Sequence, residues 1–273
     1  MDRRRRLLVT VAAACLGCLP RTAAAIEMQA DGRAAPLEFA RRHGFDSAEM
    51  RARHGASGLV RCGNAVGTAQ LTLRNDVITT AAHVLIGTDG APRASGSSCT
   101  FEPILGASGP VPIDTTSIAA GSRNPLAEPA TRDWAVARLT RPVRGAAPYR
   151  LSGHPASGHD IVMCGGGHGT ATRIAAESCA VRAVGASADG TRELRIDCNA
   201  GPGTSGAAMV TEDHTMLGIY VGYRSTAPDK AQPFSDRHYN FGITIEGPFR
   251  RAVLELAAGS GEEVSRIRSP GVR

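Results

Sequence analysis

Short runs of β-branched and apolar residues, separated by Gly, Pro, Asn and Asp, follow one another from Leu59 onwards and constrain the fold most strongly. This texture is typical of strands in a sandwich or barrel. Residues 68–73 alternate, residues 74–76 form a turn and residues 77–80 resume, which predicts a hairpin. We therefore expect an all-β protein, and 273 residues suffice for one large β domain or two small lobes with a buried core.

Other segments complete this outline. Further strands are expected at residues 134–139, 161–164, 179–184, 193–196, 207–210, 217–221 and 240–245, loops at 91–112 and 121–129, and a closing helix at 249–258. Residues 26–57 are expected to be partly helical, with Ser47 as an N-cap, and form either a pro-segment or an N-terminal extension. The main domain is expected at residues 58–258, followed by a flexible tail at 259–273.

Residues 1–25 have the pattern of an export signal. Four arginines at positions 3–6 precede an apolar run at residues 7–19 and an Ala-x-Ala site, which predicts cleavage after Ala25. A buried helix and a lipoprotein anchored through Cys15 or Cys18 are the alternatives. A cleaved signal implies a secreted or periplasmic protein with no membrane contact afterwards.

The charge of the chain is concentrated in this signal. Five of the 31 basic residues and one of the 25 acidic residues lie in residues 1–25, so the remainder carries a net charge of about +2. Aromatic residues make up only 4% of the chain, and no basic stripe has aromatic residues interleaved with it. The sequence therefore does not predict nucleic-acid binding.

Five cysteines follow the predicted signal, at positions 62, 99, 164, 179 and 198. They are too scattered for the paired ligands of a zinc site, and we expect no metal. Because an exported chain enters an oxidising compartment, two disulfides and one free thiol are expected.

Three segments carry residues suited to amide hydrolysis by serine, which needs a base, a carboxylate that orients the base, and donors for an oxyanion. The first segment is a β-branched strand that ends in Thr80-Ala81-Ala82-His83, where two small residues allow a sharp turn that exposes the histidine. The second begins with Asp133, directly ahead of an apolar strand.

The third segment surrounds Ser205. Gly203 and Gly206 flank the serine and give the backbone the freedom for a tight turn, in which the amides of Gly203 and Ser205 can point at one oxyanion. We therefore expect His83 as general base, Asp133 as its orienting carboxylate and Ser205 as nucleophile.

These residues, in this order, resemble the trypsin-like serine peptidases of the chymotrypsin fold. The resemblance covers roughly residues 59–256 and looks closer to the shorter bacterial members, including relatives of glutamyl endopeptidases, than to animal trypsins. It implies two six-stranded antiparallel β-barrels with a C-terminal helix, no cofactor and a protein or peptide substrate. An α/β-hydrolase requires the order Ser, Asp, His and is excluded.

The resemblance also implies a substrate site. Tyr220, Val221 and Gly222 continue a strand similar to the one on which the family binds the substrate backbone, and Asn199 stands six residues before Ser205, at the pocket position. Because Asn199 is not a carboxylate, a preference for Arg or Lys is not expected. Asp197 remains either a pocket carboxylate or a solvated strand end.

This sequence departs from the family at three positions. Thr204 and Ala207 stand where an Asp and a Gly are common, and Tyr220 stands where glutamyl endopeptidases tend to carry a histidine. We therefore expect a small or neutral residue on the acyl side of the cleaved bond. Because Thr204 has no charge, we also expect the oxyanion loop to be held without an ion pair to a new α-amine, so that signal cleavage suffices for activity.

Two disulfides are predicted from the strand pattern. A Cys62–Cys99 bridge would staple the hairpin that carries His83, and a Cys179–Cys198 bridge would join a strand pair that leads into the Ser205 loop. Cys164 is then the free thiol. The histidines outside the triad are expected at surface or loop positions.

The sequence therefore predicts a monomeric secreted serine endopeptidase. The alternative is a catalytically inactive relative that binds a peptide, carbohydrate or surface protein on the same scaffold.

Overall fold

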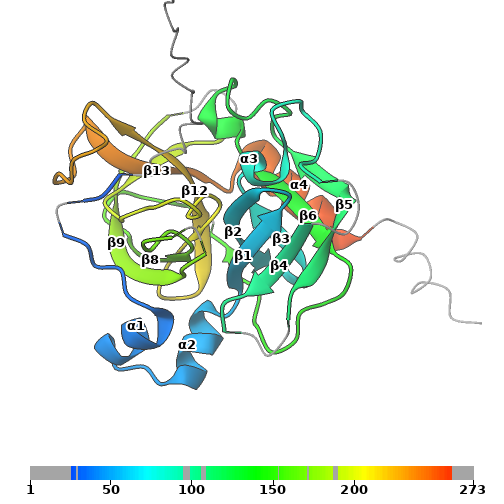
Figure 1. The fold of residues 1–273 in the computed structure, drawn as a ribbon, viewed down its shortest axis with the longest axis horizontal. Helices are drawn as coiled ribbons and strands as arrows, with labels where there is room; N and C mark the ends of the chain where they lie inside the picture. Colours follow the sequence, from blue (N-terminus) through cyan, green and yellow to red (C-terminus); the bar gives the residue numbers. More distant parts are fainter. Residues whose placement is uncertain are drawn as a thin grey trace, which may run out of the picture.

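The computed structural model describes residues 26–28, 30–94, 99–105, 109–152, 154–170, 172–186 and 190–259. Two β-barrels stand side by side, with the helices α1 and α2 below them in the view of Figure 1. The predicted signal peptide and the predicted tail beyond Gly259 lie outside the described residues. Among the described residues, no helix is long and apolar enough to cross a membrane.

The N-terminal barrel closes in the strand order β1-β2-β3-β6-β5-β4. Its strands are β1 (Ser57–Cys62), β2 (Ala65–Thr72), β3 (Arg74–Thr80), β4 (Cys99–Pro103), β5 (Val111–Ala120) and β6 (Ala135–Leu139). Val60, Leu71, Ile78, Phe101 and Val136 are fully buried in its core. The expected hairpin is formed by β2 and β3, and all neighbouring strands are antiparallel.

The C-terminal barrel contains β8 (Asp160–Gly165), β9 (Ala175–Val184), β10 (Glu193–Ile196), β11 (Ala208–Val210), β12 (Thr215–Ser225) and β13 (His238–Thr244). These six antiparallel strands close through the pairing of β11 with β12. A short strand, β7 (Arg150–Leu151), adds to β12 in parallel. The expectation of two six-stranded antiparallel barrels is confirmed.

The C-terminal helix α4 (Gly247–Ala258) follows the C-terminal barrel but packs against β3 and β6 of the N-terminal barrel. Phe249 is fully buried and stacks on Trp134 with ring centroids 5.1 Å apart. The helix therefore ties the end of the second barrel to the first. It begins two residues before the predicted start, because Pro248 is well suited to the first helical turn.

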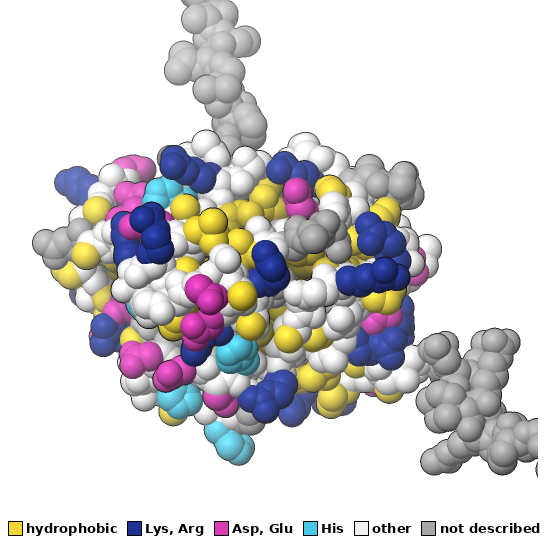
Figure 2. All heavy atoms as spheres, turned by 90° about the horizontal axis from the view of Figure 1, so that it is seen from below, with side chains coloured by type: hydrophobic (Ala, Val, Ile, Leu, Met, Phe, Trp, Pro, Cys, Tyr) yellow, Lys and Arg dark blue, Asp and Glu magenta, His cyan; other side chains and the backbone are white. Residues whose placement is uncertain are grey.

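The N-terminal extension forms α1 (Pro36–Arg42) and α2 (Ser47–His54) and packs on the C-terminal barrel. Phe39 and Met50 are 2% and 0% exposed. The N-cap of α2 is Asp46, whose side chain accepts from the amide of Glu49, so the prediction of Ser47 as the cap is wrong by one residue. Figure 2 shows this face from below, where basic, acidic, histidine and apolar side chains are interspersed.

Two other expectations need correction. Residues 91–112 are not all loop, because β4 lies inside this range and pairs with β1, and β5 begins at its end. The histidines outside the triad are not all at the surface: His54 and His238 are 5% and 2% exposed.

Both expected disulfides are present, Cys62–Cys99 and Cys179–Cys198, and Cys164 is a buried free thiol. Cys62 and Cys99 are directly opposite each other in the pairing of β1 with β4, so this bridge joins neighbouring strands and does not staple the hairpin that carries His83. Burial raises the pKa of the Cys164 thiol to about 12, so that it stays protonated.

Candidate active site

His83 lies in a short helix that follows strand β3 of the N-terminal barrel. Strand β3 ends at Thr80, and the helix α3 (Ala82–Leu85) begins two residues later. Ala81 and Ala82 are both fully buried, and their small side chains allow the turn to pack against the barrel. The side chain of His83 remains 20% exposed.

Asp133 fixes both the ring and the backbone of His83. It follows the 3-10 helix η1 (Ala130–Arg132) and precedes β6, the strand that pairs with β3. Its Oδ2 lies 2.6 Å from His83 Nδ1, and its Oδ1 accepts a 2.9 Å hydrogen bond from the backbone amide of His83. A carboxylate at Nδ1 selects the tautomer that carries the proton there and leaves Nε2 free to accept one.

The loop that carries Ser205 belongs to the C-terminal barrel but contacts the strands that lead to His83. The carbonyl of Ser205 accepts from the amide of Thr68 at 2.8 Å. A Cβ added at Gly206, whose φ is +88°, would lie 2.2 Å from both the Thr68 carbonyl and Thr80 Oγ1. Only glycine permits this approach, which sets the serine beside the start of the His83 turn.

The hydroxyl of Ser205 and the ring of His83 are not hydrogen-bonded to each other in this structure, although both residues are described. In unliganded serine hydrolases such contacts are often long, and they tighten only when substrate binds. His83 thus comes from a turn, Asp133 from the start of a strand and Ser205 from a loop. These three segments meet where the barrels join.

The backbone amides of Gly203 and Ser205 differ from the neighbouring backbone amides in their hydrogen bonding. The amides of Thr204, Gly206 and Ala207 donate to Gly201, Tyr220 and Thr204. Among the residues that the structure describes, no acceptor is present for the amides of Gly203 or Ser205. Two free donors separated by one residue in a glycine-flanked turn are the arrangement required to bind an oxyanion.

The buried side chain of Thr204 stabilises the turn that carries Ser205. The residue is 3% exposed, and its hydroxyl accepts from the amide of Gly201 at 2.9 Å and donates to the carbonyl of Gly166 at 2.8 Å. The neutral threonine therefore uses both hydrogen-bonding capacities of its hydroxyl within the protein, with no charged partner.

The predicted substrate residues of β12 surround a bulge in the strand. Tyr220 pairs with Gly242 and Gly222 with Phe241, so Val221 is the extra residue. The backbone of Tyr220 bonds the Ser205 loop, since its carbonyl accepts from the amide of Gly206 at 2.8 Å. Its side chain is buried, which raises the pKa of the phenol, and its hydroxyl donates to Asn240 at 3.1 Å.

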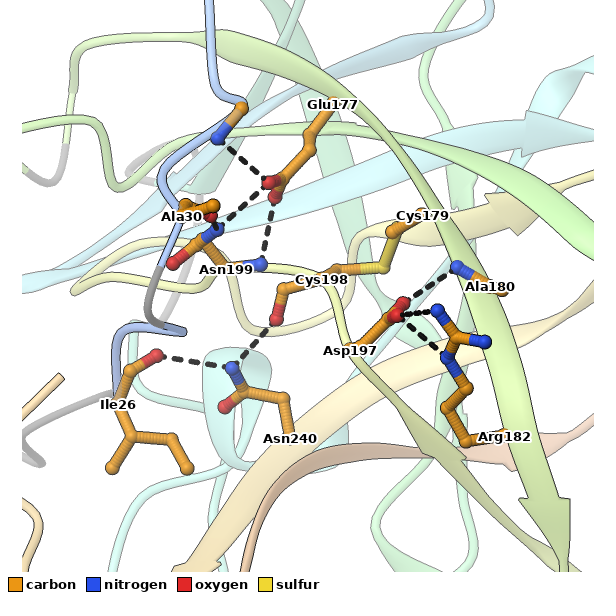
Figure 3. The surroundings of a disulfide bond; sticks show 11 residues. Ile26, Ala30, Glu177, Cys179, Ala180, Arg182, Asp197, Cys198, Asn199 and Asn240 are labelled. Carbon is orange, nitrogen blue, oxygen red and sulfur yellow. Dashed lines mark hydrogen bonds and ion pairs between the residues drawn. A yellow bond between two sulfur atoms is a disulfide. The ribbon is translucent and has the colours of Figure 1, made fainter. Parts of the chain in front are cut away.

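Asn199, the predicted pocket residue, is only 1% exposed. Its Oδ1 accepts from the amide of Met28 at 2.7 Å, and its Nδ2 donates to the carbonyl of Ala30 at 2.8 Å and to Glu177 at 2.7 Å. The structure thus places its side chain against the N-terminal extension, as Figure 3 shows. Sequence reasoning missed this contact, because residues 26–57 carry no motif that assigns them a partner.

Asp197 points to the other side of the same disulfide, as Figure 3 shows. Its carboxylate pairs with Arg182 and accepts from the amide of Ala180 at 2.7 Å. Asp197 is therefore a strand-end carboxylate, but it is ion-paired and its side chain is only 19% exposed, so the expectation of a solvated strand end is met only in part.

A polar cavity of about 240 Å³ opens beside Gly201 and Pro202. Its wall includes Glu27 and Arg33 of the extension and residues 228–231 of the segment between β12 and β13. Because the cavity borders the loop that carries Ser205, it is a candidate space for a substrate side chain. No cluster of His, Cys, Asp and Glu suited to a metal ion occurs among the residues that the structure describes.

Several solved protease structures share this fold. A Glu endopeptidase has a TM-score of 0.62 at 15% identity, covering 85% of this chain and 100% of that one. The protease Anisep from Arthrobacter nicotinovorans has a TM-score of 0.54 at 15% identity over 77% and 97% of the two chains. A scabies mite inactivated protease paralogue has a TM-score of 0.54 at 13% identity over 75% and 93%. At these identities the likeness shows the fold alone.

The sequence itself gives the family. No curated protein matches the chain at a significant level. The family model described as the trypsin-like peptidase domain matches residues 63–219, which is more than half of the chain and includes His83, Asp133 and Ser205. The protein therefore belongs to the family of trypsin-like peptidases.

Proposed function

We propose that this protein is a serine endopeptidase in which Ser205 attacks the substrate, His83 takes the proton of the serine hydroxyl, and Asp133 stabilises the resulting imidazolium. The observation that carries the proposal is the 2.6 Å contact of Asp133 with His83 Nδ1 beside a serine loop with two free amides. A buried carboxylate, a partly exposed imidazole and adjacent oxyanion donors are the parts that acyl transfer requires.

The chemical steps follow from these positions. His83 Nε2 accepts the Ser205 proton as Oγ adds to the substrate carbonyl, and the amides of Gly203 and Ser205 stabilise the oxyanion. His83 then donates that proton to the leaving amine as the C–N bond breaks, which leaves an acyl-enzyme. A water molecule, activated by the same histidine, hydrolyses the ester and restores the serine.

We further propose a small or neutral residue on the acyl side of the cleaved bond. Asp197 is neutralised by Arg182, and Asn199 is enclosed, so neither presents a charge to bind a basic side chain. A profile of cleaved peptides dominated by Arg and Lys, or by Glu, contradicts this preference.

A secreted or periplasmic location is part of the same proposal, because both disulfides require an oxidising compartment to form. The expected substrates are proteins or peptides.

The test is covalent labelling of the purified protein by a small alkyl fluorophosphonate. We expect a label that disappears in Ser205→Ala and falls sharply in His83→Ala. The matched control is Ser178→Ala, because Ser178 is an exposed serine that also lies beside a histidine, His43, and this variant should label like the wild type. A folded wild-type protein that takes no label would instead favour an inactive binding protein on this scaffold.

A further inference from the structure

Residues 26–34, of which the structure describes all but residue 29, run along the C-terminal barrel and are called the strap here. Ile26 is fully buried, and its carbonyl accepts from Asn240 Nδ2 at 3.0 Å. At the other end, Ala34 and Ala176 exchange two backbone hydrogen bonds of 3.0 and 2.8 Å. The strap is therefore anchored at both ends to the barrel that carries Ser205.

Between these anchors the strap reaches the backbone just ahead of the Ser205 loop. As Figure 3 shows, Asn199 lies between the strap and Glu177. Glu177 accepts from the amide and the Nδ2 of Asn199, each at 2.7 Å, and from the amide of Gly32 at 3.1 Å. Burial raises the pKa of the Glu177 carboxyl, while these three donors act in the opposite direction.

Arg33 makes the second contact between the strap and the backbone next to the Ser205 loop. Its side chain is only 7% exposed, and its Nη1 donates to the carbonyl of Gly167 at 3.0 Å. Its charge is balanced within the strap by Asp31 and Glu27, each 2.8 Å away. A nearly buried guanidinium with two carboxylate partners is fixed in orientation, so the segment around Gly167 is held in a defined place.

Gly167 in turn rests on the oxyanion loop. A Cβ added at Gly167 would lie 2.4 Å from Thr204 Oγ1, and one added at Gly201 would lie 2.0 Å from the Gly167 carbonyl. The neighbouring Gly166 carbonyl accepts from Thr204. The space enclosed among Arg33, Glu177, Asn199, Thr204 and their neighbours is only about 10 Å³, so displacement of the strap is transmitted directly to the loop.

We infer that the strap positions the oxyanion loop, with Arg33 and Glu177 as positioning residues that act through Gly167 and Asn199. This inference rests on the proposed function, because the loop is taken to bind the oxyanion. Internal side chains then hold the amides of Gly203 and Ser205 in place, without an ion pair to a charged α-amine.

The decisive variant is Arg33→Met, which keeps the length and apolar stem of the side chain but removes every donor. We expect the fluorophosphonate labelling rate constant to fall about 10-fold to 100-fold, less than the loss from deleting an oxyanion donor outright. For any peptide that the wild type cleaves, kcat should fall and KM should change little. The matched control is Arg182→Met, which removes the ion pair with Asp197 but, among the described residues, no hydrogen bond to the strap.

A second variant keeps the inference testable if Arg33→Met does not fold. Glu177→Gln has the same shape, but its amide group presents a donor to one of the donors of Asn199, so the labelling rate should again fall. Arg33→Lys keeps the charge and one donor nitrogen, and it should recover part of the rate. If Arg33→Met folds and labels as fast as Arg182→Met, the inference is wrong while the proposed function stands. If Arg33→Met does not fold, Glu177→Gln is compared with Arg182→Met in the same way. If the wild type itself takes no label, the proposed function fails first.

Discussion

Thr68 of the N-terminal barrel donates a 2.7 Å hydrogen bond to the carbonyl of Gly203 in the C-terminal barrel. The same hydroxyl accepts from the amide of Gly166 at 3.0 Å. One buried side chain therefore connects both barrels and the two segments that border the candidate oxyanion site. Its environment explains why a polar residue is fully buried in β2.

Replacing Thr68 with Val keeps the shape of the side chain and removes both hydrogen bonds. We expect the free energy of unfolding to fall by about 1–3 kcal/mol, because the Gly203 carbonyl and the Gly166 amide lose their partner. The fluorophosphonate labelling rate should fall about 10-fold or more, since the loop is released. Thr68→Ser retains the hydroxyl and should stay near the wild type; equal rates for Val and Ser variants would count against this role.

Asp133→Asn tests the orientation of the histidine. An asparagine offers one acceptor where two are used, by the ring and by the amide of His83. We expect kcat to fall by about 10³–10⁴-fold, because the wrong tautomer of His83 is favoured. The comparison is Asp114→Asn, whose carboxylate bonds, among the described residues, only to Thr116 on β5. A kcat within a few-fold of the wild type would rule out Asp133 as the orienting group.

The extension is predicted to be needed for folding. A shortened protein that begins at Gly58 lacks Ile26, Phe39 and Met50, all of which are buried. The loss of each such side chain costs about 2–5 kcal/mol, against a typical total stability of about 5–15 kcal/mol. Circular dichroism and thermal melting should show an unfolded or strongly destabilised protein, whereas one that begins at Ile26 folds. Full labelling of the shorter protein would identify residues 26–57 as a removable pro-segment.

His54 is predicted to make stability depend on pH. Burial, with added repulsion from His214, Arg53 and His43, lowers its pKa to about 4. The unfolded chain therefore binds a proton between about pH 6.5 and pH 4 that the folded chain excludes, so stability is present above this window and is lost as the pH falls through it. The expected loss is about 3 kcal/mol.

Urea unfolding at pH 7 and pH 4.5 checks this prediction. The variant His54→Gln cannot titrate and should lose most of the difference, whereas His154→Gln, at an exposed position, should retain it. An unchanged pH dependence in His54→Gln would place the effect elsewhere.

The barrels and the turn that carries His83 were predictable because their signals are local. The alternation of β2 and β3 predicts the hairpin, and two alanines before His83 predict the turn that exposes it. The disulfide pairing was also correct, although Cys62–Cys99 joins β1 to a strand hidden in a Gly- and Pro-rich stretch. The Gly and Pro residues on either side hide the sequence pattern of a short strand. The strand with which it pairs lies far away in the sequence, so local residues do not indicate the pairing.

The parts that hold the site could not be predicted in the same way. Glu177 lies just ahead of the strand predicted at residues 179–184, and nothing in its neighbours identifies Asn199 as its partner 22 residues away. Arg33 stands in a charged segment that is typical of a solvated surface. Both contacts arise only once the extension lies on the closed barrel, and local patterns of hydrophobicity carry no information about that placement.

The two barrels divide the proposed chemistry between them. His83 and Asp133 lie on the N-terminal barrel, while Ser205 and its loop lie on the C-terminal barrel and contact the other through Thr68. A chain with only one barrel formed therefore holds either a base without a nucleophile or a nucleophile without a base. Under the proposed function, such a half-folded molecule is unable to cleave its neighbours during synthesis, so completion of folding is itself the step that switches on proteolysis.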